Sequence, residues 1–451
     1  MSPHRSRRAT RQHPLSPQAY RLIAMRFLVY VGIQASYFIG VLGTLTYVLG
    51  SDALGNALAV VFMNACLIVG SFVGGSLLDL WGPRRHFVLA VAGVIVASIY
   101  FLTTKETAFH IILGAAILGF MIGLTDVIAR SYPAHLSGDP RELKRINGAI
   151  SAASNIGVVV GPLVGGAIAA VAPTNAVFVF TLVCAVVALV PGLGFRPLRS
   201  PHDDGAVARG DVPAGAGTRG AGGGAAGASL AAGGETAEPA SRAIGIREGI
   251  RAVTGSMALT LLFWVGFLCF LGYGAFDPIE SLFYRDVLKV GASWMGWLSA
   301  AAGAGAVLGA LVIMRLPGRL MNIRTLLIIQ IIEGIGCLLY VGTPLVGVAM
   351  AGQLLLGCAF GAFTPLQNTL MQRHAPLAVV GRVSSIMNFG FNIAGVLPLV
   401  AAPWLAATMG VQGALLVASA TVLVMPAIIL VVRWKRIAAL SREEAESRTS
   451  E

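Results

Sequence analysis

Long apolar stretches separated by short polar segments dominate the chain. Each stretch is long enough to cross a bilayer, because about 20 residues of helix span its ~30 Å hydrocarbon core. Helix is predicted throughout, since lipid offers the backbone no hydrogen-bond partner and the stretches lack the alternation of barrel strands. The twelve stretches cover residues 27–49, 54–78, 87–103, 108–129, 149–171, 176–195, 256–276, 293–314, 325–341, 345–370, 383–407 and 411–432.

The composition excludes a soluble globular enzyme. Of the 451 residues, 56% are hydrophobic and only 12% are charged, whereas a soluble domain carries roughly 25% charged residues. All five cysteines lie within apolar stretches and form no C-x-x-C pair. We therefore expect an all-α integral membrane protein without a disulfide framework or a metal site.

The basic residues are distributed asymmetrically between alternate loops. With the N-terminus inside, 29 of the 32 Lys and Arg residues fall in inner segments, and only Lys105, Arg285 and Lys289 fall in outer loops. This asymmetry predicts that both termini are cytoplasmic. The net charge of +12 is then explained by topology and by contact with anionic membrane lipids, so no nucleic-acid partner is expected.

The middle of the chain changes character and divides it into two halves. From position 205 to 234, 21 of 30 residues are Gly or Ala, which is typical of a flexible linker. The predicted organisation is a basic N-terminal tail (1–26), a six-helix bundle (27–196), the linker (197–250), a second six-helix bundle (251–433) and a C-terminal tail (434–451).

The two halves resemble each other. The segment that begins Arg145-Ile-Asn and reaches Asn155 aligns with the segment that begins Arg382-Val-Ser and reaches Asn392, at an offset of 237 residues. Both segments open the fifth span of their half. Two parallel six-helix repeats are a transporter architecture, with the substrate site at mid-membrane between them.

The loop between spans 2 and 3 reads Gly75-Ser-Leu-Leu-Asp79-Leu-Trp-Gly82-Pro-Arg84-Arg85. It resembles the G-x-x-x-D-x-x-G-x-[RK]-[RK] motif of the major facilitator superfamily at every defining position. The resemblance implies a twelve-helix fold in which these residues, with Arg382, form a conformational latch between the halves. A carboxylate at this place can also face a helix N-terminus, and the alternative is a surface pair of Asp79 with Arg84 or Arg85.

Span 5 contains a second motif. Its residues Gly157, Gly161, Pro162, Gly165 and Gly166 match G-x-x-x-G-P-x-x-G-G, which marks exporters and antiporters within the superfamily. Small residues allow helices to approach closely, and proline bends the span. The arginine that many drug antiporters carry in span 4 is replaced by Ala115, and the second-half copy of the loop motif is degraded, with Arg315 at the acid position.

Polar residues within the spans are candidates for lining a substrate cavity. No Lys, Arg or His is expected deep in a span, so anionic substrates are disfavoured, and amides with aromatic rings suit bulky neutral or cationic compounds. Helix–helix hydrogen bonding is the alternative role for each residue. The candidates are Gln34, Tyr37, Asn64, Asn155, Tyr273, Gln353, Gln367, Asn388 and Asn392.

Two acids within spans are candidates for proton coupling. Asp126 lies in span 4 near its cytoplasmic end, with Arg130 one turn later, and Glu333 lies deeper in span 9. Asp277 and Glu280 are interpreted as interfacial residues at the outer end of span 7.

These features together favour a proton-driven exporter of small amphipathic neutral or cationic compounds in the cell membrane. We expect a monomer with no metal and no cofactor, energised by the proton gradient. An uptake symporter of the same superfamily and a non-transporting polytopic receptor are the alternatives.

The topology can be tested at the linker. A cysteine introduced as Ser229→Cys should resist a membrane-impermeant maleimide added outside intact cells, because the charge distribution places the linker inside. Labelling before permeabilisation would contradict the topology.

Overall fold

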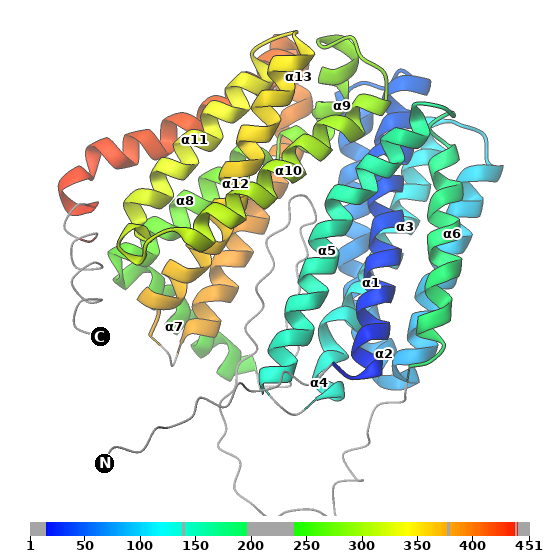
Figure 1. Ribbon diagram of the computed structural model, residues 1–451, viewed down its shortest axis with the longest axis horizontal. Coiled ribbons are helices and arrows are strands. Elements are labelled where there is room, and N and C mark those ends of the chain that lie inside the picture. The colour runs from blue at the N-terminus through cyan, green and yellow to red at the C-terminus, as the bar shows by residue number, and fades with distance from the viewer. Residues whose placement is uncertain (1–14, 138–139, 196–238, 377–378, 438–439, 441–451) are drawn as a thin grey trace, which may run out of the picture.

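The computed structural model describes residues 15–137, 140–195, 239–376, 379–437 and 440. The Gly/Ala-rich centre of the predicted linker, position 229 included, lies outside these residues. The described residues contain helices and no strands (Figure 1). In chain order the helices are α1 (Pro17–Ala35), η1 (Ser36–Val48), α2 (Ala53–Thr103), α3 (Ala108–Ser131), α4 (Pro133–Leu136), α5 (Pro140–Ala169), α6 (Ala176–Gly192), α7 (Pro239–Gly255), α8 (Met257–Tyr273), α9 (Phe276–Asp286), α10 (Ser293–Arg315), η2 (Gly318–Leu320), α11 (Ile323–Val341), α12 (Val346–His374) and α13 (Val380–Val432).

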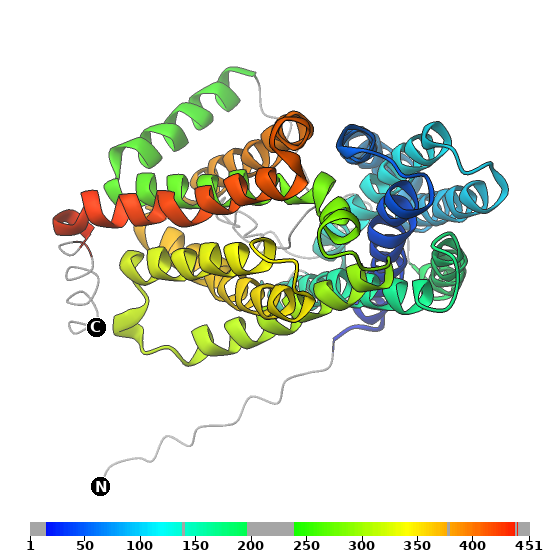
Figure 2. The same ribbon diagram turned by 90° about the horizontal axis from the view of Figure 1, so that it is seen from above.

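The twelve predicted spans are confirmed. Helix α2 turns back at Gly82 and α13 at Gly410, whose φ angles of 73° and 79° only glycine adopts readily, so each of these long helices crosses twice. Span 1 consists of α1 with η1, a 13-residue π-helix, and span 7 consists of α8 with α9. The six spans before the linker form one bundle and the six after it form another (Figure 2).

Two boundaries differ from the sequence prediction. Helix α1 begins at Pro17, capped by the Ser16 side chain, so Arg26 belongs to a span and not to the tail. Arg26 is also buried, so the expectation that spans contain no internal Lys, Arg or His is wrong. Residues 239–250, assigned to the linker, lie in α7. The sequence pattern did not predict this helix, because the segment is basic and too polar to be recognised as a membrane span.

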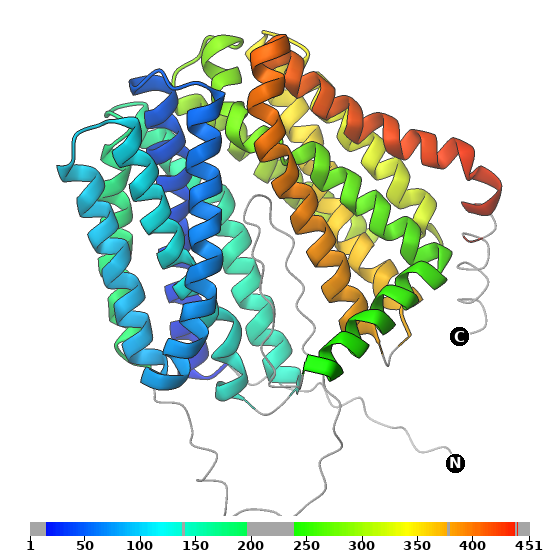
Figure 3. The same ribbon diagram turned by 180° about the vertical axis from the view of Figure 1, so that it is seen from behind.

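The two bundles share a hydrophobic core at one end only. That core combines Tyr37 and Leu45 from the first half with Phe283 and Leu415 from the second. At the opposite end each half has a separate core, and the bundles diverge (Figures 1 and 3). We call the end with the shared core the closed end; α1 begins at the other.

Glycines of the span 5 motif bring α5 against both halves. A methyl group built on Gly161 would lie 2.7 Å from Gln34 Cβ, and one built on Gly166 would lie 2.7 Å from the Gly296 Cα of α10. Gly157 and Gly165 likewise face Tyr30 and Ile39 of span 1. The motif therefore allows α5 to contact span 1 within its bundle and α10 across the boundary.

We predict that Gly161→Ala destabilises the protein by about 1–3 kcal/mol, because the added methyl group overlaps neighbouring atoms. The matched control is Gly148→Ala on the same helix, where a methyl group would meet nothing within 4 Å. Thermal unfolding in detergent should show a lower Tm for Gly161→Ala only, and an unchanged Tm would contradict the close packing.

Candidate functional site

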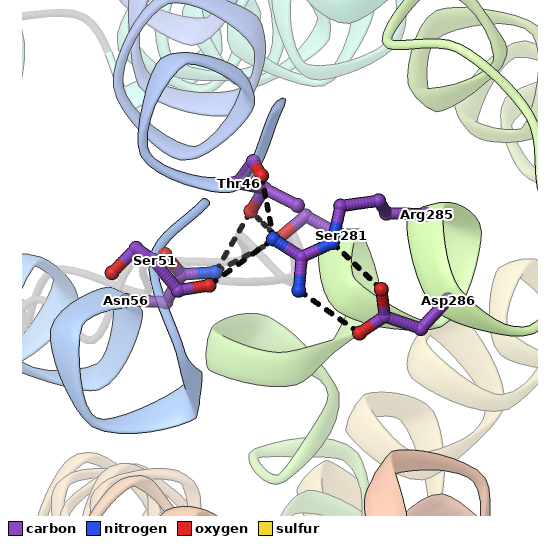
Figure 4. Close-up of polar contacts among 6 residues, drawn as sticks. All are labelled: Thr46, Ser51, Asn56, Ser281, Arg285 and Asp286. Carbon is purple, nitrogen blue, oxygen red and sulfur yellow. Dashed lines mark hydrogen bonds and ion pairs between the residues drawn. The ribbon is translucent and has the colours of Figure 1, made fainter. Parts of the chain in front are cut away.

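Polar side chains join the two halves at the closed end (Figure 4). The hydroxyls of Thr46, at the end of η1, and Ser281, on α9, share a hydrogen bond of 2.7 Å. Asn56 of α2 donates to both hydroxyls at 3.0 Å. All three residues are buried, so the halves are joined here by hydrogen bonds shielded from solvent.

Arg285 adds a charged contact to this cluster. Its Nη1 donates to the main-chain carbonyls of Thr46 at 2.7 Å and Ser51 at 3.3 Å. Its Nε and Nη2 donate to the two carboxylate oxygens of Asp286 at 2.7 and 3.0 Å (Figure 4). Because this bidentate pair fixes the guanidinium plane, the Nη1 amino group is held toward the other half.

We call Thr46, Ser51, Asn56, Ser281, Arg285 and Asp286 the gate.

Two carboxyl groups lie one and two turns before Arg285 on α9. Asp277 is in the first turn of the helix, and its carboxyl faces the hydroxyl of Tyr37 from η1 in the other half. Glu280 accepts hydrogen bonds at Oε1 from Tyr340 at 2.6 Å and from Gln353 at 3.1 Å. Span 7 continues beyond Asp277 and Glu280 through α9, which ends at Asp286, so the helix is longer than the sequence predicted.

Aromatic rings surround the carboxyl pair. Tyr273 stacks on Phe276 with ring centroids 5.7 Å apart and on Phe360 at 6.0 Å, and Phe276 stacks on Tyr340 at 6.1 Å. Three of the predicted cavity residues thus come together around the acids: Tyr37, Tyr273 and Gln353. Acids combined with aromatic faces are suited to organic cations.

The other cavity candidates lie elsewhere. Buried Gln367 donates to the Leu262 carbonyl at 3.2 Å and Asn64 to the Val60 carbonyl at 3.0 Å. The Gln367 bond joins α12 to α8 and agrees with the alternative of helix–helix hydrogen bonding, whereas the Asn64 bond stays within α2. The remaining members are Gln34, which lies against Gly161; Asn155 and Asn388, which are exposed; and Asn392, which is half-buried.

Asp126 lies in a buried ion pair within the N-terminal bundle. It pairs with Arg26 of α1, and Arg130 lies 3.8 Å away on the same helix. Arg26 also donates to Ser154 of α5 at 2.8 Å and stacks over the Tyr30 ring at 4.2 Å. Three helices of one half are joined by this guanidinium, which the apolar pattern alone had placed outside the membrane.

Glu333 is fully buried within the C-terminal bundle. Its Oε1 accepts from the Cys269 thiol of α8 at 3.5 Å, and its Oε2 has no hydrogen-bond partner among the residues that the structure describes. The neighbouring Gln330 donates to the Val265 carbonyl at 3.1 Å. The surroundings of Glu333 are therefore the packed support helices of one half.

The latch residues are only partly described. Gly82 forms the turn, and Arg84 and Arg85 are exposed. A methyl group on Gly75 would contact nothing within 4 Å in the described part of the chain. The side chain of Asp79 is outside the described residues. Arg382 pairs with Glu248 of α7 in its own half.

Among the described residues, no group of three or more His, Cys, Asp or Glu side chains is arranged to hold a metal ion.

Comparisons with known proteins agree with this architecture. The family model of the Major Facilitator Superfamily matches residues 22–258 and 262–450. The multidrug efflux pump Tap of Mycolicibacterium fortuitum is 24% identical over 378 residues, covering 80% of this chain and 82% of that protein.

Solved structures with a similar fold have low sequence identity to the chain. The nucleoside transporter NupG superposes with a TM-score of 0.63 at 12% identity, covering 92% of this chain and 98% of that one. A bacterial homologue of the iron transporter ferroportin, solved in an inward-facing state, superposes with a TM-score of 0.63 at 14% sequence identity. The match covers 93% of this chain and 99% of that one. A D-xylose–proton symporter superposes with a TM-score of 0.63 at 14% sequence identity, and the match covers 91% of this chain and 96% of that one.

The family match spans nearly the whole sequence, and the twelve helical passes, the two bundles and the loop motif all agree with it. The chain belongs to the Major Facilitator Superfamily of transporters and is a multi-pass protein of the cell membrane.

Proposed function

We propose that this protein exports small amphipathic neutral or cationic compounds by alternating access, driven by the proton gradient. The observation that carries this proposal is the asymmetry between the two ends. A shared apolar core and the gate close one end, whereas at the other each half has its own core. With the topology predicted from charge, this arrangement is the inward-facing state.

Rocking of the two halves requires the gate to break. Its cross-boundary bonds are few and are made by hydroxyls, one amide and one guanidinium. Each neutral bond contributes a net ~0.5–1.5 kcal/mol and a charge-assisted bond about 1.5–3 kcal/mol. Such a gate is strong enough to stabilise the inward-facing state and weak enough to be opened by the binding of a ligand or a proton.

Export is supported by the span 5 motif and by the relative named as a multidrug efflux pump. The aromatic rings around Asp277 and Glu280 support a cationic or amphipathic substrate. The uptake alternative has support from the D-xylose–proton symporter and the nucleoside transporter among similar structures.

Direction of transport can be measured in cells that lack their own efflux pumps. Expression should lower the accumulation of ethidium, a fluorescent amphipathic cation, and an uncoupler should remove the difference, because export draws on the proton gradient. Asp79→Asn, expressed to the same level, should restore accumulation, since an amide lacks the charge required of the latch. Increased ethidium accumulation would favour uptake.

The gate can be tested with spin labels at Leu54 and Gly291, which lie on opposite halves at the closed end and are exposed. Arg285→Leu removes the charged contact, worth about 1.5–3 kcal/mol, and should enrich a longer label distance about 10- to 150-fold.

The matched control is Lys289→Asn, which removes a positive charge from the same outer segment without removing a gate bond. Asparagine also tolerates the positive φ of 56° at this position. Equal distance distributions for Arg285→Leu and Lys289→Asn would contradict the role of Arg285 in the gate.

A further inference from the structure

An apolar groove with two arginines at one end lies on the surface of the N-terminal bundle, between α2 and the end of α6. Its volume is about 600 Å³. Leu193, which follows α6, lines it from one side. The residues of α2 that line it are Trp81, Arg84, Arg85, Val88, Leu89 and Ala92.

Local helix geometry and one close contact build this groove. Arg85, Leu89 and Ala92 recur at intervals of four and three positions, so they lie on one face of span 3. Gly192 brings the end of α6 against the same helix, because a methyl group built on it would lie only 1.7 Å from Cε1 of the buried Phe87 ring. This packing holds the neighbouring Leu193 beside span 3 as a side wall.

The two arginines lie at the membrane boundary opposite the closed end. Helix α2 begins beside the gate residue Asn56 and turns back at Gly82, so Arg84 and Arg85 are in the first turn after this break. From Arg85 to Ala92 the groove follows the helix for about 10 Å, and the exposed Val96 continues the same face. The charged end is therefore at the level of lipid headgroups, and the apolar part is at the level of the acyl chains.

The groove faces lipid and not the space between the two bundles. Figure 1 places α6 at the edge of the molecule, away from the second half. The last turns of α6 expose only apolar side chains next to the groove, among them Val186, Val187 and Val190. Such a surface is suited to contact with acyl chains.

The charge of the groove is entirely positive. Both arginines are exposed, and no acid lines the groove. Among the side chains that the structure describes, which do not include Asp79, none forms an ion pair with Arg84 or Arg85. Guanidinium groups offer forked donors that fit phosphate oxygens, and an exposed indole such as Trp81 is typical of the headgroup level. A phosphate that carries an apolar tail matches both parts of the groove.

We propose that this groove binds an anionic phospholipid, with its phosphate at Arg84 and Arg85 and an acyl chain along Val88, Leu89 and Ala92. With the topology predicted from charge, the lipid belongs to the cytoplasmic leaflet, where anionic lipids attract basic segments. The proposal goes beyond the proposed function, because lipid binding requires neither a substrate nor a proton gradient.

The test measures lipid binding to the full-length protein in a non-ionic detergent by native mass spectrometry. Dioleoyl phosphatidylglycerol should bind more tightly than dioleoyl phosphatidylcholine, which has the same acyl chains and no net charge. The double variant Arg84→Gln/Arg85→Gln should weaken the binding of phosphatidylglycerol about 30-fold, because both arginines attract the anionic headgroup, and should leave that of phosphatidylcholine unchanged.

Leu193→Gln separates a lipid site from a site for free phosphate, because it keeps both arginines and makes the side wall polar. It should weaken the binding of phosphatidylglycerol, and inorganic phosphate should not displace the lipid from the wild-type protein. Unchanged lipid binding in Leu193→Gln, or displacement by inorganic phosphate, would overturn the lipid assignment.

The matched control is Arg247→Gln/Arg251→Gln, which removes two exposed positive charges from α7, outside the groove. This variant should keep the wild-type affinity for phosphatidylglycerol. The proposal is overturned if the wild-type protein binds both lipids equally, if Arg84→Gln/Arg85→Gln retains the preference, or if the α7 variant loses it to the same extent.

Discussion

The architecture depends on the close approach of backbones around α5. Gly161 lies against span 1 of its own half and Gly166 lies against Gly296 of α10 in the other half. In lipid the hydrophobic effect does not drive helices together, so van der Waals contact between small residues carries the association. Helix α5 thereby contacts span 1 of its own bundle and, across the boundary between the two halves, α10. The shared core and the gate form at the same end of the molecule, where this boundary stays closed.

Polar chemistry in this protein separates into two kinds according to whether it crosses that boundary. Arg26 with Asp126, and Glu333 with Cys269, lie within single halves and stabilise their bundles. Removing one member of such a buried set leaves an unpaired polar or charged group, which is costly. Thr46 and Asn56, which both bond to Ser281, join different halves and must part from it when the protein changes state.

The sequence predicted the helical passes well because the apolar pattern directly reflects membrane thickness. It failed where a helix continues in polar residues: Arg26 and Asp277 lie beyond the apolar stretches, yet inside α1 and α9. The gate was missed for another reason. Thr46 and Ser281 are 235 residues apart, and no local sequence pattern predicts that their hydroxyls form a hydrogen bond. Arg285 did carry a signal, as one of three basic residues in segments otherwise free of them.

The acceptors of Arg285 across the boundary are main-chain carbonyls of Thr46 and Ser51. Every amino acid presents such a carbonyl. The N-terminal half can therefore drift in sequence at these two positions without losing its share of the charged contact, provided the end of η1 keeps its course. The C-terminal half has no such freedom, because only arginine can bridge a carboxylate and a carbonyl in this fork geometry. The evolutionary constraint on the gate's charged contact thus falls unequally on two halves that resemble each other in their internal repeat.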